Sequence, residues 1–279
     1  MTTDLTDRSA LIRSRERAAA GDPALFLQQD AADDIQERLE LVNRTFTSPA
    51  VVTPWPDLWG ARLPGAKVIA DEEVLALDEG AHDLVIHSLS LHWANDPVGQ
   101  LVQARRALKP DGLFLGALFG GRTLHELRAA LAEAEASVSG GLSPRVLPMG
   151  EIRDVGALMQ RAGFALPVAD NLARSVTYAD PLRLMLDLRA MGEANVMQAR
   201  AKGFTRRAVL LDAARRYAEA YTTPDGRVSA TFETIFLTGW APDASQPQPL
   251  RPGSAAHRLA DALDTAEVPL DDPATPRRN

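Results

Sequence analysis

His92 and Trp93 form the neighbouring pair of side chains best suited to chemistry in this sequence. An imidazole can move a proton near neutral pH, and an indole offers a flat wall for a substrate. Four further candidates also follow short apolar runs and are suited to holding a cofactor: Asp71, Glu72, Ser88 and Gly120. Core packing would explain His92 and Trp93 equally well, and a helix N-cap with first-turn acids would explain Asp71 and Glu72.

The apolar runs that precede these residues predict a parallel β-sheet. They are short and continuous, as in strands buried on both faces, and occupy residues 50–52, 67–70, 83–86 and 113–118. A predicted helix over residues 97–108 joins the last two runs into a βαβ unit, which makes their strands parallel. Because ligands of an open parallel sheet bind beyond the carboxyl ends of its strands, we expect the candidate residues to share one cleft.

The remaining segments are predicted to be mostly helical. Helices are expected at residues 7–19, 23–43, 123–136, 150–162, 180–191 and 206–221. The arginine-rich face of the first helix is interpreted as solvated, Pro23 as the opening of the second, and Thr123 with Glu126 as a capping box for the third. Residues 228–240 form the longest β-like run and are expected to close the sheet as an antiparallel edge strand.

The domain organisation expected from these elements is one core with decorations. Residues 1–22 form an N-terminal helical arm, and residues 23–240 form the main domain, with a helical insertion at about residues 123–222. The tail at residues 241–279 is rich in proline and is expected to be disordered past about residue 256.

Composition excludes several classes of function. The net charge of −7 argues against nucleic-acid binding, because no long-range field would gather phosphates on the surface. The chain has no cysteine, which excludes disulfides and thiolate metal sites. His82, His87 and His92 do not have the spacing of a metal motif, so no metal site is predicted. Ser88 and Ser90 lack the glycines of a nucleophile elbow, which argues against a hydrolase.

Several motifs resemble those of class I S-adenosylmethionine-dependent methyltransferases, which have a Rossmann-like sheet. They are Asp71-Glu72-Glu73-Val74-Leu75, Asp83-Leu84-Val85-Ile86, Leu91-His92-Trp93-Ala94-Asn95-Asp96 and Leu108-Lys109-Pro110-Asp111-Gly112. Other stretches resemble one subfamily, the methyltransferase-like assembly factors of respiratory complex I. These stretches are residues 119–124, 140–145, 187–195 and 245–255. In its mitochondrial members this subfamily implies hydroxylation of an arginine in a quinone-proximal subunit, and a close cousin is the malonyl carrier-protein methyltransferase of biotin synthesis.

The chain departs from the family pattern at the first strand. Val52-Thr53-Pro54-Trp55-Pro56 stands where the resemblance implies an acid and a Gly-x-Gly turn, and each proline removes an amide donor. The segment up to Lys67 is too short for the usual second strand with its ribose-binding acid and helix, so the N-terminal half of the sheet is expected to be shortened. Spacing makes Asp71 the ribose acid, whereas the resemblance makes it the residue facing adenine.

Three functions remain open at this point. The first is a role in complex I assembly through a subunit near the quinone site, with or without hydroxylation of an arginine. The second is an active methyltransferase for a protein or carrier-protein substrate, with S-adenosylmethionine as cofactor, and the third is a non-catalytic binding scaffold. No stretch is long and apolar enough to span a membrane, and the polar start resembles no signal or transit peptide. We therefore expect a bacterial relative in the cytoplasm that visits the inner membrane with its partner.

Overall fold

The computed structural model describes residues 4–247 and 258–266, and the chain divides into two units, Met1–Asp243 and Ala244–Asn279. The described part of the second unit contains one short helix, α9 (Leu259–Ala262). Most of the tail that was expected to be disordered lies outside the described residues. The first unit holds every other element.

A six-stranded sheet forms the centre of the first unit, with the order β2-β1-β3-β4-β6-β5. Its strands are β1 (Pro49–Val52), β2 (Lys67–Ile69), β3 (His82–Ser88), β4 (Leu108–Phe119), β5 (Ala165–Tyr178) and β6 (Val228–Trp240). The pairs β1–β2, β1–β3 and β3–β4 are parallel, whereas β4–β6 and β5–β6 are antiparallel. The expected α/β fold, with a mostly parallel sheet and an antiparallel edge, is confirmed.

Two details of the antiparallel half differ from expectation. Residues 228–240 form an antiparallel strand, but this strand, β6, lies between β4 and β5, and β5 is the edge. The range expected to be a helical insertion therefore contains a strand of 14 residues. Most side chains of β5 are partly or fully exposed, so its sequence lacks the apolar run that marks a buried strand. What fixes its place is a long backbone ladder with β6, from Ala165 opposite Trp240 to Tyr178 opposite Val228.

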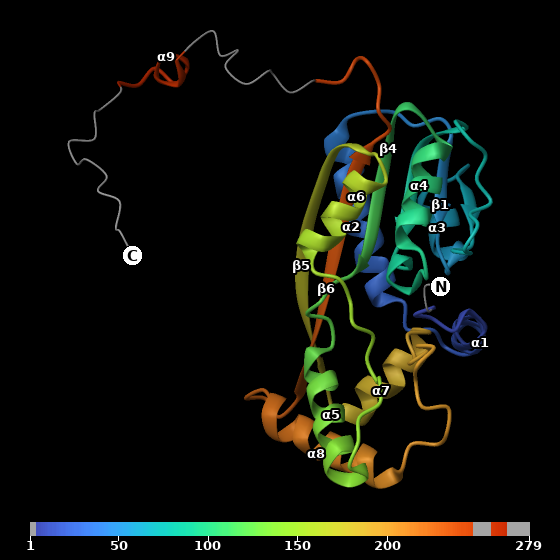
Figure 1. Ribbon diagram of the computed structural model, residues 1–279, viewed down its shortest axis with the longest axis vertical. Helices are drawn as coiled ribbons and strands as arrows, with labels where there is room; N and C mark the ends of the chain where they lie inside the picture. Colours follow the sequence, from blue (N-terminus) through green and yellow to red (C-terminus); the bar gives the residue numbers. More distant parts are fainter. Residues whose placement is uncertain (1–3, 248–257, 267–279) are drawn as a thin grey trace, which may run out of the picture. The chain divides into compact units, whose positions relative to one another are not determined.

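Helices cover both faces of the sheet (Figure 1). They are α1 (Arg8–Ala19), α2 (Phe26–Val42), α3 (Pro56–Arg62), α4 (Pro97–Ala107), α5 (His125–Ser139), α6 (Ile152–Arg161), α7 (Pro181–Ala190) and α8 (Arg207–Tyr221). Side chains of α2 pack in one core cluster with Leu84 and Ile86 of β3, whereas α4 and α6 pack with Val85 in the other. Because neighbouring residues of a strand point to opposite faces, β3 supplies both cores.

Helix ends follow local chemistry, with two exceptions. The Asp180 side chain accepts hydrogen bonds from the amides of Leu182 and Arg183, which confirms it as the N-cap of α7. The capping box at Thr123 is wrong, because the Thr123 hydroxyl donates to the Glu233 carbonyl and α5 begins at His125 without a side-chain cap. Pro23 does not open α2, which begins at Phe26.

The arginine-rich face of α1 is not fully solvated, contrary to the interpretation from sequence. Leu11, Ser14 and Ala18 are buried, and Arg8 and Arg15 reach inward beside them to the carboxyl ends of the parallel strands. The helix therefore takes part in building the site. Within the described ranges, none of the helices combines the length and the apolar character needed to cross a bilayer.

Candidate functional site

The backbone N–H groups in the loop after β1 are already hydrogen-bonded within the protein. The amide of Thr53 donates to the Ile69 carbonyl at 2.9 Å, and the amide of Trp55 donates to the Thr53 hydroxyl at 3.1 Å. Pro54 and Pro56 have no amide hydrogen to offer. None of the four residues from Thr53 to Pro56 can therefore give a backbone N–H to a ligand in this conformation.

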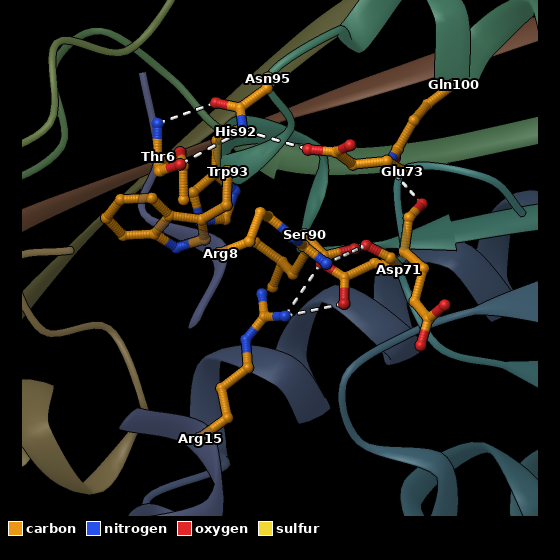
Figure 2. Close-up of polar contacts among 12 residues, drawn as sticks. Thr6, Arg8, Arg15, Asp71, Glu73, Ser90, His92, Trp93, Asn95 and Gln100 are labelled. Carbon is orange, nitrogen blue, oxygen red and sulfur yellow. Dashed lines mark hydrogen bonds and ion pairs between the residues drawn. The ribbon is translucent and has the colours of Figure 1, made fainter. Parts of the chain in front are cut away.

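Asp71, just beyond β2, is held by two arginines of α1 (Figure 2). Arg15 Nη1 lies 2.7 Å and 2.9 Å from the two carboxylate oxygens, and Arg8 Nη1 lies 3.5 Å from Oδ2. Arg8 also donates to the backbone carbonyl of Asp71 at 2.6 Å. Only 6% of the Asp71 side chain is exposed, so its carboxylate is committed to these cations. Sequence patterns gave no sign of this partnership, because the residues lie 56 and 63 positions apart.

Glu72 and Ser88 contribute to the site through the backbone and through packing. The Glu72 side chain is exposed, while its carbonyl accepts a hydrogen bond from the amide of Gln100 on α4. Gln100 Oε1 in turn lies 2.8 Å from His87 Nε2 at the end of β3. Burial lowers the pKa of His87, against the opposing effect of this hydrogen bond, so the ring is neutral. Ser88 is fully buried, and its hydroxyl has no partner within the described residues.

His92 and Trp93 converge on one carboxylate that sequence reasoning did not single out. The Trp93 indole donates to Glu193 Oε2 at 2.7 Å, and His92 Nε2 lies 3.2 Å from the same oxygen. Burial opposes ionisation of Glu193, but His92, Arg15 and the indole hydrogen bond outweigh it and hold its pKa below the usual value. Only 9% of this side chain is exposed. The sequence gives one sign of Glu193: it directly follows Gly192, where α7 was expected to stop, within the stretch 187–195 that resembles the assembly factors.

A cavity of about 220 Å³ lies beside Glu193 and Trp93. Its wall is mostly apolar and includes Phe119, Leu127, Leu147, Met185, Leu188 and Phe232. Arg145 also lines it, but Glu135 engages this guanidinium, which lowers the pKa of Glu135 to about 2. An ionised acid at the edge of an apolar cavity suits a cationic group on a flexible apolar stem.

The predicted site residues are thus divided between two places. Trp93 lines the cavity and His92 supports it through Glu193, whereas Asp71, Glu72, Ser88 and Gly120 are not among its lining residues. Gly120 packs against β6 instead, since a side chain there would meet Glu233 at 2.7 Å and Ile235 at 2.9 Å. Of the six residues expected to share one cleft, only Trp93 lines this cavity, and a cofactor cleft for the other five stays a prediction.

The residues at the cofactor edge do not fit S-adenosylmethionine as they stand. The Asp71 carboxylate is engaged by Arg8 and Arg15, and the loop at Thr53 offers no free backbone donor. As for metals, the described residues contain no group of three histidine, aspartate or glutamate side chains that could hold an ion.

Comparison with known proteins places this geometry in a family. A methyltransferase domain model matches residues 49–116. The mitochondrial arginine-hydroxylase NDUFAF5 of Danio rerio is 40% identical over 83% of this chain and 72% of its own length. Its Homo sapiens counterpart is 44% identical over 69% of this chain, and the match spans only 56% of that relative.

A second group of relatives has a different activity in its name. Malonyl-[acyl-carrier protein] O-methyltransferase of Laribacter hongkongensis is 31% identical over 86% of this chain and 91% of its own length. Methyltransferase domains of this kind bind S-adenosylmethionine in general, and this chain shares their fold. Identity is higher to the arginine-hydroxylase relatives. The chain therefore belongs to the class I methyltransferase-like family that includes the arginine-hydroxylase NDUFAF5.

Proposed function

We propose that this protein binds an arginine side chain of a respiratory complex I subunit, near the quinone site, and presents it for hydroxylation during assembly of the complex. The single observation that carries the proposal is the ionised, nearly buried Glu193 beside an apolar cavity. Similarity to the arginine-hydroxylase relatives supports the choice of arginine. We place the protein in the bacterial cytoplasm, with a visit to the inner membrane when it meets its partner.

The chemistry assigned to the chain is recognition and positioning. A guanidinium presents a planar fork of N–H donors that matches a carboxylate, and its three methylene groups favour an apolar wall. Glu193 supplies the carboxylate, and the Trp93 indole and His92 fix the position of its Oε2. Two arginines in the described part of the chain line the cavity: Glu135 neutralises Arg145, and the side chain of Arg189 is exposed, so solvent weakens its repulsion of a bound cation. The mostly apolar lining lowers the local dielectric around the carboxylate, which strengthens the pairing.

Deletion of the gene tests the proposed function. We expect loss of NADH–quinone activity and of intact complex, together with loss of the hydroxyl group on the target arginine, detected by mass spectrometry. Complementation with wild type or with Glu37→Gln, an exposed acid of α2, should restore all three, whereas Glu193→Gln should not. Normal assembly in the deletion strain together with an unmodified arginine in wild type would exclude the proposal.

An active S-adenosylmethionine-dependent methyltransferase is the second candidate. The methyltransferase domain match and the near-complete coverage of the malonyl carrier-protein relative favour it. The commitment of Asp71 to Arg8 and Arg15 opposes it. Calorimetry with S-adenosylmethionine at about a millimolar separates the candidates, because a working enzyme would be largely saturated at that concentration. The third candidate, a scaffold without catalysis, is motivated by Pro54 and Pro56, and any turnover by the purified protein would exclude it.

A further inference from the structure

Two surface grooves beside α1 adjoin the cavity at Glu193. The first groove shares Ala194 and Asn195 with the cavity wall. The second shares Arg189 with the cavity and Arg17 with the first groove. These shared residues make the three hollows neighbours, and we refer to the row that they form beside α1 and the end of α7 as the track.

Three arginines along this track have no partner. Arg13 and Arg17 stand one helical turn apart on α1, and Arg189 lies in the last turn of α7. All three are exposed, and none of their guanidinium groups makes a hydrogen bond or ion pair with any residue in the described ranges. We refer to Arg13, Arg17 and Arg189 as the rim arginines.

The other charges on the track do not cancel the rim arginines. Arg200 is paired with Asp7 at 2.9 Å, so it adds little free charge. Glu16 and Asp22 are the acids that line the two grooves, which leaves a cationic excess. This excess stands out on a chain whose net charge is −7. The two grooves are therefore cationic, whereas Glu193 supplies negative charge in the cavity, whose wall shares Arg189 with the second groove.

We propose that the rim arginines dock acidic residues that flank the target arginine in an acidic segment of the partner protein. This inference rests on the proposed function, because it takes the cavity as the place of the target arginine. A basic residue between acidic ones pairs with Glu193 and with the rim at the same time, whereas a uniformly basic segment is repelled by the rim. A nucleic acid fits less well, since its phosphates would face both Glu193 and a net negative surface.

Binding of three synthetic peptides to the full chain tests this inference. The first has a central arginine flanked by aspartates, the second has asparagines as flanks, and the third keeps the aspartates but replaces the arginine with citrulline. We expect the acidic arginine peptide to bind roughly tenfold more tightly than the asparagine peptide at low salt, because three exposed ion pairs of modest strength act together. The preference should shrink as ionic strength rises.

Variants in which the rim arginines are replaced test the same peptides against wild type. The combined variant Arg13→Gln, Arg17→Gln and Arg189→Gln should bind the acidic and asparagine peptides equally, with an unchanged unfolding midpoint because the three side chains are exposed. Arg153→Gln is the control, since Arg153 is exposed on α6 and lines a separate groove. It should leave the preference intact.

The outcomes separate this inference from the proposed function. If flanking acids do not matter in wild type, or still matter in the rim variant, the rim is not their docking site and the inference is overturned. Arginine could then still bind better than citrulline, which would leave the proposed function standing. Equal binding of the arginine and citrulline peptides would overturn the proposed function itself. Displacement of the acidic peptide by a single-stranded oligonucleotide at equal concentration would also overturn the inference, in favour of a phosphate-binding rim.

Discussion

Glu193 combines two properties that rarely occur together, near-complete burial and a negative charge. Its Oε2 accepts from Trp93 and His92, and the charge of Arg15 adds to the balance that lowers its pKa. A carboxylate stabilised in this way is already ionised and oriented before a ligand arrives. The free energy of desolvating it is therefore spent in folding rather than in binding.

Replacing Glu193 with glutamine should remove the preference for arginine over citrulline. The shape is kept, but a neutral amide cannot form a charge-assisted pair, so affinity for an arginine peptide should fall about tenfold to a hundredfold. Citrulline binding should hardly change. Calorimetry with both peptides measures the effect, and the exposed Glu37→Gln on α2 is the control. Retention of arginine preference in Glu193→Gln would show that the cavity recognises arginine in another way.

His87 makes stability depend on pH. Burial lowers its pKa below the ordinary value of 6.5, so the unfolded chain takes up a proton that the folded chain refuses. Stability is therefore highest above pH 6.5 and falls as the pH drops below it, by up to about 1.4 kcal/mol per pH unit while only the unfolded state is protonated. Urea unfolding of wild type and His87→Gln at a series of pH values checks this. A slope between pH 5 and 6.5 that is identical in the variant would refute the assignment to His87.

The sequence pointed to only part of the candidate site, for physical reasons. Trp93 and His92 drew attention because strand ends mark the ligand side of a parallel sheet, and their catalytic role stays a prediction. Ser88 and Gly120 also follow strand ends, but both pack against neighbouring elements. The sequence of their own segments does not show this packing. Glu193 was missed because its partner His92 lies 101 residues away, and no local pattern announces a pairing over that distance.

Helix α1 crosses the carboxyl edge of the sheet and connects two parts of the site there. Besides the two arginines on Asp71, the segment before it is tied to residues 196–198, with the Asp7 amide donating to the Val196 carbonyl at 2.9 Å and the Gln198 amide to Leu5 at 2.8 Å. Asn95 joins this network, since its amide contacts both Thr6 and Glu73 (Figure 2). Helix α1 and the residues before it therefore connect Asp71 to the segment that carries Glu193.

The Arg15–Asp71 pair should be strongly coupled in stability. Only 11% and 6% of the two side chains are exposed. Removing Asp71 therefore leaves the Arg15 cation buried without its carboxylate, and removing Arg15 leaves the Asp71 carboxylate with only the longer ion pair to Arg8 at 3.5 Å. Arg15→Gln and Asp71→Asn should each lower the free energy of unfolding by roughly 3 kcal/mol, and the double variant should lose less than the sum. Arg13→Gln, on the exposed face of the same helix, should change it by less than about 0.5 kcal/mol. Additive losses in urea unfolding would mean that the pair does not interact.

The elements that sequence predicted well are those with local signals. Asp180 before Pro181 marked α7, and Gly163, with φ at +82°, ended the helix at residues 152–161. The parallel strands β1, β3 and β4 were found because most of their residues are buried on both faces. Strand β5 was missed because its stability comes from pairing with β6 rather than from its own side chains. The paired residues lie far apart in the sequence, Ala165 with Trp240 at one end and Tyr178 with Val228 at the other. Non-local pairing leaves little trace in a single segment.

One core cluster runs through the first unit from the sheet into the helices at its end. It contains Leu84 of β3 and Ile35 of α2, and also Leu184 of α7 and Tyr217 of α8. Figure 1 shows α5, α7 and α8 gathered at one end of the sheet, where they could be taken for a separate helical domain. Continuity of buried side chains argues instead that they share stability with the sheet.

Unfolding of the first unit should therefore be a single cooperative event. Leu84→Ala in the sheet and Leu184→Ala in α7 each remove a fully buried side chain and should each cost about 2–5 kcal/mol. If the core is continuous, either substitution speeds amide hydrogen exchange equally in β3 and in α8, because both exchange through global unfolding. Calorimetry should show one transition at a lower temperature in each variant. Faster exchange confined to α7 and α8 in Leu184→Ala, with β3 still protected, would instead identify the helical end as a separately unfolding module.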